Sequence, residues 1–419
     1  MSPPVNESPA SGVNTRAERV NRPIVLCFVA YYLPGYRSGG PVRTIANFVD
    51  HLGDEFDIRI ICRDRDALDT APYSDVAVNA WNAVGKAQVF YASSGTLSLA
   101  GVARLLRQTP HDVLYLNSFF SPAFTGLPLL ARRLRMAPKK PCVIAPRGEF
   151  SEGAISLKAA KKRIYLAASK AVGLYDGLHW QASSEFELGD IRRECGAKAE
   201  VIDVAPDLPP KLDETARLEN SVATRAPGPL RLVFLSRISP KKNLDYLLRV
   251  LKGVTEPVTL AIYGPGENKE YWNQCQRLIK EMPNHIGISY EGEVTPDQVN
   301  AIFAAHDLFV LPTRGENFGH VILESLTAGT PVLISDQTPW QASENGGVRT
   351  LSLEDPKQWC DEIGRWAKYN SQELAELRHS ARQIALCCLG SGESYRQNQE
   401  LFKSVGKISQ STFSRAENS

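Results

Sequence analysis

The sequence DLFVLPTRGENFGHVILESLTAGTP, residues 307–331, decides the fold class of this chain. Its apolar run Leu308–Leu311 predicts a buried parallel strand. A helical pattern follows and stops at Gly329, shortly before Pro331, as helices commonly do. A buried strand that leads through a turn into a helix is one unit of an open α/β sheet, and such sheets bind ligands at the carboxyl ends of their strands. We therefore expect a ligand site in this turn.

Two glutamates, Glu316 and Glu324, bracket the turn with seven residues between them. Glu324 lies on the helix, about 7 Å beyond its start at roughly 1.5 Å per residue. The free amides of Gly319 and His320 at the helix start attract an anion such as a diphosphate. A carboxylate at Glu324 can accept hydrogen bonds from a ribose, while Glu316 reaches a second polyol. The alternative is a loop acid and a solvated helix acid with no shared ligand.

The Glu-x7-Glu spacing resembles that of the retaining, nucleotide-sugar-dependent glycosyltransferases of family four. These enzymes have the GT-B fold, in which two Rossmann-like parallel-sheet α/β domains face each other across a cleft. The resemblance covers nearly the whole chain and implies a catalytic role for Glu316. It also implies substrate contacts for the residues that follow, namely Asn317, Phe318, Gly319, His320, Val321 and Glu324.

A second element of the family lies upstream, in the segment Leu232–Asn243. The family's Arg-x4-Lys pattern follows the first strand of the donor domain, and its positions here are Arg237 and Lys242. In the family these cations hold the nucleotide diphosphate. A departing diphosphate gathers negative charge, which fixed cations stabilise without a metal. The alternative for both residues is a solvated strand end.

Three further turns match the family more loosely. Gly39 and Gly40 lie between a strand and a helix, where glycines let backbone amides approach a phosphate or sugar closely. The turn at Gly264 corresponds to one that lines the donor pocket, and Glu293 and Val294 correspond to residues near the nucleobase. Ordinary turn chemistry is the alternative for each. The spacing around Gly39 lacks a third glycine and a following acid, which excludes an NAD-binding fingerprint.

One turn departs from the family. Many members carry a histidine after the fifth strand of the first domain, close to the reacting carbon of the sugar. Here the stretch is Ile144–Phe150, with Arg147 at that position. An arginine can bind a sugar or a phosphate but cannot act as a neutral base. We expect Arg147 in the catalytic site; the alternative is a strand-end charge paired with Glu149 or Glu152.

Length and composition fit a large enzyme of two or three domains, because 419 residues exceed what a single core usually organises. A net charge of +2 argues against a nucleic-acid partner. The eight cysteines form no Cys-x2-Cys pair and no metal-binding pattern. With no signal-peptide pattern and no run of 18 apolar residues, we expect a reduced, cytoplasmic protein.

The apolar runs divide the chain into five parts: a disordered N-terminal tail (1–22), an acceptor-binding Rossmann-like domain (23–208), a linker (209–229), a nucleotide-sugar-binding Rossmann-like domain (230–392), and a helix that returns to the first domain (393–419). The strands expected in the first domain are Ile24–Ala30, Phe56–Cys62, Gln88–Ala92, Val113–Asn117, Cys142–Pro146, Leu178–Ala182 and Ala199–Val204. Those expected in the second are Leu232–Leu235, Val258–Tyr263, Ile288–Glu291, Leu308–Leu311 and Pro331–Ile334.

The stretch 125–170 carries eleven Lys and Arg residues against two acids. Within it, Leu157–Leu166 is basic on one side and apolar on the other. Such a helix can lie on an anionic membrane, where each cation contributes about 1 kcal/mol. We therefore expect peripheral contact with the inner membrane face through residues 132–170. A solvated helix face is the alternative.

The sequence as a whole predicts a retaining hexosyltransferase. It would move a sugar from a nucleoside diphosphate sugar to a saccharide or lipid-linked saccharide, in the biosynthesis of a cell-surface polysaccharide, with no cofactor and no metal. Two alternatives stay open. One is a GT-B epimerase or phosphorylase, although we find no pyridoxal-binding lysine motif, and the other is a non-catalytic subunit of a polysaccharide assembly.

Overall fold

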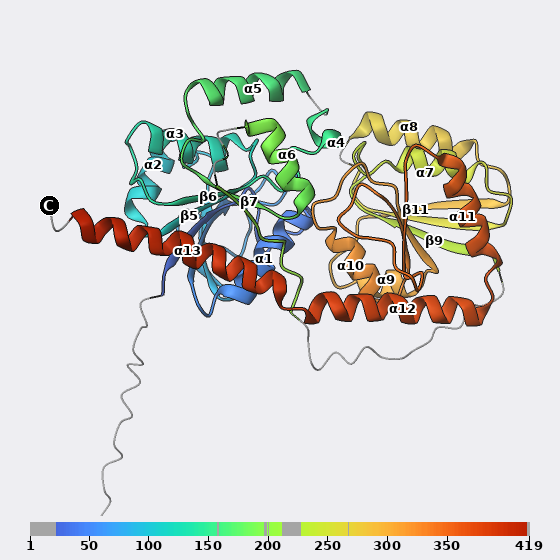
Figure 1. Ribbon diagram of the computed structural model, residues 1–419. Helices are drawn as coiled ribbons and strands as arrows, with labels where there is room; N and C mark the ends of the chain where they lie inside the picture. Colours follow the sequence, from blue (N-terminus) through green and yellow to red (C-terminus); the bar gives the residue numbers. More distant parts are fainter. Residues whose placement is uncertain are drawn as a thin grey trace, which may run out of the picture.

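The computed structural model describes residues 22–156, 159–196, 199, 201–211, 228–266 and 268–416. The expected tail, apart from residue 22, lies outside the described residues. So does most of the expected linker, from 212 to 227. The remaining chain forms two α/β domains side by side, each built around its own sheet (Figure 1).

The first sheet has eight strands in the order β3-β4-β2-β1-β5-β6-β7-β8, and all neighbours except β3 and β4 are parallel. Its strands are β1 (Ile24–Phe28), β2 (Asp57–Arg63), β3 (Trp81–Val84), β4 (Ala87–Ala92), β5 (Val113–Asn117), β6 (Cys142–Ala145), β7 (His179–Ala182) and β8 (Val201–Val204). The connecting helices are α1 (Gly40–Leu52), α2 (Leu99–Gln108), the π-helical turn η1 (Pro122–Gly126), α3 (Leu127–Arg133), α4 (Glu152–Ile155), α5 (Ala159–Ala171) and α6 (Glu185–Cys195).

The second sheet has six parallel strands in the order β11-β10-β9-β12-β13-β14. Its strands are β9 (Leu230–Leu235), β10 (Val258–Tyr263), β11 (Ile286–Gly292), β12 (Leu308–Leu311), β13 (Val332–Ser335) and β14 (Val348–Leu351). Its helices are α7 (Leu244–Leu251), α8 (Lys269–Lys280), α9 (Val299–Ala304), α10 (His320–Thr327), α11 (Pro356–Lys368) and α12 (Ser371–Gly390). Because β9 and β12 are hydrogen-bonded neighbours, the loops that follow them meet at one edge of the sheet.

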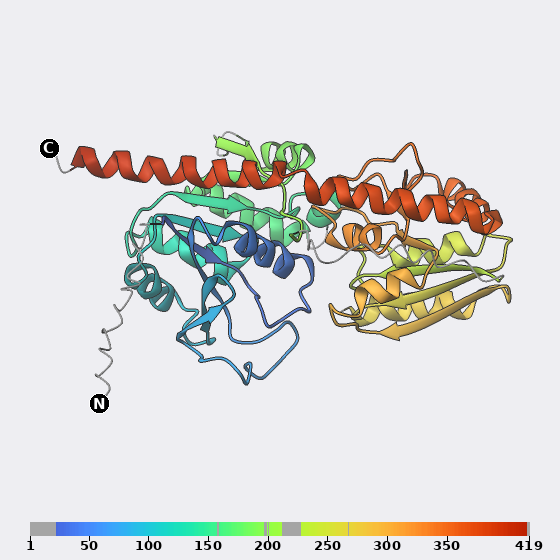
Figure 2. The ribbon, with the colours of Figure 1, turned by 90° about the horizontal axis from the view of Figure 1, so that it is seen from below.

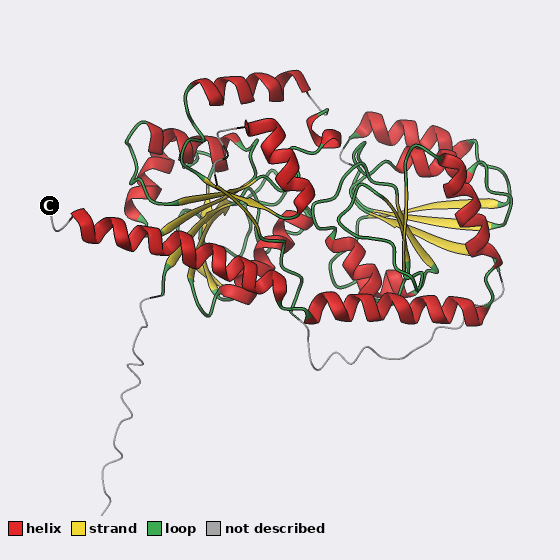
Figure 3. Ribbon diagram, in the orientation of Figure 1, coloured by secondary structure: helices red, strands yellow, loops and turns green. Residues whose placement is uncertain are grey.

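Helices cover both faces of each sheet (Figure 3), which explains why the central strands are continuous apolar runs. All four residues of β12 are buried, and so are all four of β6 and β13. Each domain therefore buries its own core, and the cleft between the domains is free to hold polar groups.

The last helix, α13 (Glu393–Ala416), leaves the second domain and packs on the first. Figure 2 shows α12 and α13 in succession along one side of both domains. Phe402 is fully buried there, with its ring 4.9 Å from that of Tyr115 and 5.0 Å from that of Phe48. The C-terminal segment is thus part of the first domain's core.

Two strands were not expected from the sequence. β3 pairs antiparallel with β4 through a turn that contains Gly85, whose φ is 56°. β14 is an edge strand with only Val348 buried. Both strands are four residues long and half-exposed, so neither has the apolar run that marks a central strand. Within the described residues, no helix is long and apolar enough to cross a membrane.

Candidate functional site

A cleft of about 770 Å³, a volume that includes space open to solvent, lies between the two domains. The first domain lines it through the loop after β1 and the start of α1. The second domain lines it through the ends of its strands and through α9 and α10. The lining residues are Tyr36, Arg37, Gly39, Arg43, Leu235, Ser236, Arg237, Lys242, Gly264, Pro265, Glu293, Val294, Pro296, Val299, Val321 and Glu324.

The floor of the cleft in the second domain requires glycine at position 264. Its φ is 129°, and a Cβ there would lie 2.0 Å from the carbonyl oxygen of Ser236. The turn after β10 is therefore pressed against the end of β9, directly beside Arg237. This contact places Arg237, the expected diphosphate ligand, and the turn at Gly264, expected in the donor pocket, in the same wall of the cleft.

Two arginines of the first domain reach across the cleft to acids of the second. Arg43 forms an ion pair with Glu324, and Nε of Arg37 lies 3.4 Å from Oε2 of Glu293. Glu324 and Glu293 therefore face the cleft, as a ribose- or base-binding role requires. No sequence pattern singles out Arg37 or Arg43 as a site residue, although both flank the Gly39-Gly40 pair.

Lys242 and Glu316 form an ion pair at the inner end of the cleft. The pair is largely buried, with side chains 12% and 11% exposed. Burial alone would raise the pKa of Glu316, but Lys242 and the neighbouring Lys241 hold it below its ordinary value. A buried carboxylate held ionised beside a cation is a fixed dipole that needs no rearrangement when a ligand arrives.

The turn from β12 to α10 has the backbone that an anion site needs. Gly319 adopts the left-handed conformation (φ 80°), and a Cβ there would meet Ile322 at 2.8 Å. The indole Nε1 of Trp340 donates to the carbonyl oxygen of Phe318 at 2.6 Å and fixes the turn from behind. In the part of the chain that the structure describes, the amides of Gly319 and His320 donate to no protein acceptor.

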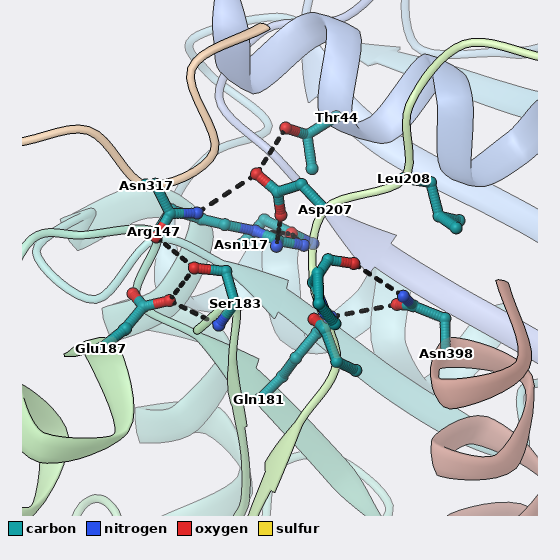
Figure 4. Close-up of polar contacts among 12 residues, drawn as sticks. Thr44, Asn117, Arg147, Gln181, Ser183, Glu187, Asp207, Leu208, Asn317 and Asn398 are labelled. Carbon is teal, nitrogen blue, oxygen red and sulfur yellow. Dashed lines mark hydrogen bonds and ion pairs between the residues drawn. The ribbon is translucent and has the colours of Figure 1, made fainter. Parts of the chain in front are cut away.

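A buried polar network joins the domains beneath the cleft, and Asp207 is its centre (Figure 4). The carboxylate of Asp207 accepts hydrogen bonds from Arg147, from the Thr44 hydroxyl (3.1 Å) and from the Asn317 amide (3.2 Å). The Asn317 amide oxygen in turn accepts from the hydroxyl of Ser183. Asp207 thereby connects α1 and the β6 turn of the first domain to the Glu316–Glu324 segment of the second.

Arg147 belongs to this network and not to the cleft lining. It pairs with Asp207, whereas Glu149 accepts hydrogen bonds from the Ser118 hydroxyl and from the Phe119 amide. Its Nε and Nη2 donate to Asn117 at 3.1 and 2.9 Å. The Arg147 guanidinium is thus bound to buried partners of the first domain and holds the turn after β6 in place.

The same network fixes the tautomer of His320. The carboxylate of Asp207 only accepts, so the Thr44 hydroxyl donates to it. Nε2 of His320 lies 3.0 Å from the same hydroxyl oxygen and must therefore carry the proton that it donates to Thr44. Burial lowers the pKa of His320 to about 4, which keeps the ring neutral. Nε2 of His320 is therefore unavailable as a base.

The depressed pKa of His320 predicts a pH dependence of stability. The unfolded chain protonates this histidine below its ordinary pKa of 6.5, whereas the folded protein resists protonation until about 4. The stability contribution is therefore complete above 6.5 and is lost as the pH falls toward 4. We expect a loss of about 2 kcal/mol between about pH 7.5 and about pH 5. The variant His320→Gln keeps a hydrogen-bond donor for Thr44 and should not show this loss of stability. If the free energy of unfolding has the same dependence on pH in the variant and in the wild type, the prediction is contradicted.

The structure places the expected site residues in three groups. Gly39, Arg237, Lys242, Gly264, Glu293, Val294, Val321 and Glu324 line the cleft. Glu316 and Asn317 line a second pocket behind it. Gly40, Arg147, Phe318, Gly319 and His320 lie in neither lining, although a Cβ on Gly40 would approach the His320 ring at 3.9 Å.

Sequence reasoning missed Thr44, Asn117, Ser183 and Asp207. Asp207 stands in the segment Pro206–Pro210, whose proline content indicates a linker. The one sequence signal for a role of Asp207 is that it is the single acid in this proline-rich segment. Its partners Thr44 and Asn317 are distant in sequence, so no local pattern connects them.

Comparison with known proteins supports the assignment of the second domain. Residues 229–369 match the family model described as glycosyl transferases group 1. A D-inositol 3-phosphate glycosyltransferase of Xylanimonas cellulosilytica is 28% identical over 207 residues, 44% of this chain and 47% of that protein. A phosphatidyl-myo-inositol mannosyltransferase of Mycobacterium leprae is 34% identical over 110 residues, 25% of this chain and 28% of that protein. The chain thus spans about half or less of the length of these relatives.

Solved structures resemble the whole described chain. Anabaena HepE in complex with UDP and glucose superimposes with a TM-score of 0.64 at 16% identity, over 91% of this chain and 100% of HepE. A sucrose-phosphate synthase from Thermosynechococcus elongatus gives a TM-score of 0.62 at 15% identity, over 91% of this chain and 100% of the synthase. Residues 229–369 of this chain therefore form a domain of the glycosyl transferases group 1 family, in a protein with the two-domain GT-B fold.

Proposed function

We propose that this protein is a retaining glycosyltransferase that moves a hexose from a nucleoside diphosphate sugar to a saccharide or lipid-linked saccharide, in the assembly of a cell-surface polysaccharide. The observation that carries the proposal is the composition of one cleft wall. This wall includes Glu293 and Val294, which suit a base, Glu324, which suits a ribose, and the cations Arg237 and Lys242, which suit a diphosphate. The resemblance of the fold to a protein solved with UDP and glucose supports the same ligand class.

In the proposed reaction, Arg237 and Lys242 stabilise the negative charge that grows on the departing diphosphate. The acceptor hydroxyl attacks the anomeric carbon from the face of the leaving group, so the configuration is retained. The departing phosphate oxygen takes the proton of that hydroxyl. This route requires no enzymic base, which fits the commitment of His320 to Thr44 and of Arg147 to Asp207.

A thermal-shift screen tests the donor class. UDP, GDP and ADP, each with and without its sugar, are added to the purified protein, and one of the three should raise the Tm. At 100 times its Kd, a nucleotide that binds only the folded state adds about 2.7 kcal/mol of stability. EDTA should leave the shift unchanged, because two fixed cations provide the positive charge. If no nucleotide raises the Tm, the proposal is wrong. If the rise in Tm requires Mn²⁺, the protein belongs to a metal-dependent class of transferase.

We further propose a peripheral membrane contact for this protein. At the end of α3, Leu134 is 53% exposed between Arg133 and Arg135, and Nε of Arg133 donates to the carbonyl of Val172 at 3.0 Å. That hydrogen bond places the basic end of α3 beside the end of α5. The membrane-facing surface consists of Arg133, Leu134 and Arg135 with Lys161, Arg163, Ile164 and Val172.

The α5 helix presents less charge than its sequence indicates. Ile164 is 70% exposed and does not pack on the core. Lys162 instead donates to the carbonyl of Ala154 at 2.7 Å and lies over the ring of Phe120. Lys158 lies outside the described residues. The surface therefore combines exposed apolar side chains with neighbouring cations, as an interfacial helix does.

Vesicle sedimentation tests this contact. The protein should bind vesicles with about 30 mol% phosphatidylglycerol and not neutral ones. The double variant Lys161→Glu/Arg163→Glu should lower the partition coefficient at least about tenfold, since each cation contributes about 1 kcal/mol. The charge-matched control is Arg277→Glu/Lys280→Glu on α8. Equal binding by the two double variants would contradict a specific surface.

A further inference from the structure

A second pocket of about 910 Å³ opens between the domains, on the other side of the Lys242–Glu316 pair from the cleft. Glu316 lines this pocket and its partner Lys242 lines the cleft, so the ion pair separates the two spaces. The walls come from both domains. The first contributes Ser184, the N-cap residue of α6, and Phe186 on α6, and the second contributes Lys241, Arg314 and Gln337 from the loops after β9, β12 and β13. The pocket thus begins at the residue that we place beside the donor sugar.

Each acid of this pocket has a polar partner within the protein, and two of the acids have a cationic one. Glu316 pairs with Lys242, and Asp190 pairs with Arg193 at 2.8 Å. Glu187 is buried and accepts from the Ser183 amide (2.8 Å) and hydroxyl (2.7 Å) as well as from the Gly148 amide. Asp336 accepts from Gln337. All four carboxylates therefore accept hydrogen bonds or form ion pairs within the protein.

Two cations of the pocket, Lys241 and Arg314, have no ion-pair partner among the described residues. Arg314 is exposed, and only its Nε is engaged, with Asn243 at 3.1 Å. The backbone amide of Arg314 donates to the carbonyl of Lys241 at 2.8 Å, so the two residues are fixed side by side.

The environment of Lys241 adds to this imbalance. Its Cε is 3.6 Å from the place where a Cβ on Gly315 would stand, and Ser151 lies beside the same glycine. Burial lowers the pKa of Lys241. The nearby positive charges of Lys242 and Arg237 lower it further, whereas the negative charge of Glu316 raises it. Lys241 shares the charge of Glu316 with Lys242, which is the ion-pair partner of that carboxylate, so an incoming anion would stabilise the half-buried Lys241 ammonium.

We propose that the second pocket is an acceptor site that binds an anionic group, a phosphoryl or a carboxylate, through Lys241 and Arg314. Ser184 and Gln337 provide hydrogen-bonding groups for hydroxyls, and Phe186, 65% exposed, provides an apolar face for a sugar ring. The assignment of this anion to the acceptor rests on the proposed glycosyl transfer, whereas the anion site itself does not. The acceptor would be either a saccharide on a phosphoryl carrier or one that contains an acidic sugar.

Calorimetric titration with the cleft saturated by the nucleotide from the screen tests the site, because the nucleotide occupies Arg237 and Lys242. Pyrophosphate and glucuronate are the two probes. At least one should bind, and a preference for pyrophosphate or for glucuronate identifies the phosphoryl or the acidic-sugar acceptor, respectively. Lys241→Ala and Arg314→Ala should each weaken binding by about 10- to 100-fold, as expected for a charge-assisted hydrogen bond.

Arg277→Ala and Lys280→Ala on α8 are the charge-matched controls and should bind the probes like wild type. Absence of binding by both probes, or unchanged binding in the double variant Lys241→Ala/Arg314→Ala, would overturn the site. Nucleotide affinity is recorded on every variant. Retained nucleotide binding with no anion binding therefore refutes the second pocket alone, whereas failure of nucleotide binding in wild type refutes the proposed function.

Discussion

Lys242→Ala and Arg237→Ala should each lower kcat by about 10²- to 10³-fold, the scale for removal of a fixed group that stabilises developing charge. Both side chains line the cleft, where water is partly excluded and a charge is worth more than in solution. Lys242→Ala should be the more severe, because it also removes the ion-pair partner of Glu316. The measurement is steady-state turnover with the donor that the screen identifies.

A double-mutant cycle separates the two effects of Lys242. If Lys242 acts partly by keeping Glu316 ionised and in place, then Lys242→Ala and Glu316→Gln should be far from additive. Arg237→Ala and Glu316→Gln should be closer to additive, since Glu316 is paired with Lys242. Lys280→Ala serves as the control for loss of a lysine. Near-wild-type turnover by both single variants would refute the assigned role.

Glu316→Gln and Glu324→Gln should have separable kinetic effects. Glu324 faces the cleft and is paired with Arg43, so a ribose that binds there replaces one polar partner by another. Such a contact differs little between the ground state and the transition state, and its loss should mainly raise the KM for the donor. Glu316 lies beside the proposed sugar position, where positive charge develops on the ring. Its loss should lower kcat more than it raises KM.

Steady-state kinetics on the two variants with one competent donor decides between these roles. Both substitutions keep the shape of the side chain and remove only the charge, so misfolding is not expected to obscure the result. A Glu316→Gln enzyme with normal kcat and a raised KM would make Glu316 a binding residue. A Glu324→Gln enzyme with a large loss in kcat would reverse the two assignments.

The sequence by itself determined the two-sheet fold and the second-domain wall of the cleft. Apolar runs such as Leu308–Leu311 mark strands locally, and their alternation with helical patterns leaves few other arrangements. Arg237 and Glu316 lie at the same edge of the sheet because β9 and β12 are adjacent and parallel, so the loops at their carboxyl ends share that edge. Short spacings within each loop then fix Lys242 and Glu324. Local patterns were sufficient here because each pattern lies within one βα unit.

Only the tertiary structure decided how the first domain takes part. Arg43 reaches Glu324 across the cleft, and Asp207 joins Thr44 and Asn317, its partners 163 and 110 residues away along the chain. No local pattern marks such pairs, because a buried carboxylate takes its partners from whichever elements the fold brings near. The same reason applies to Arg147. Its type and position in the sequence predict a ligand contact, whereas its ion pair with the buried Asp207 is visible only in the tertiary structure.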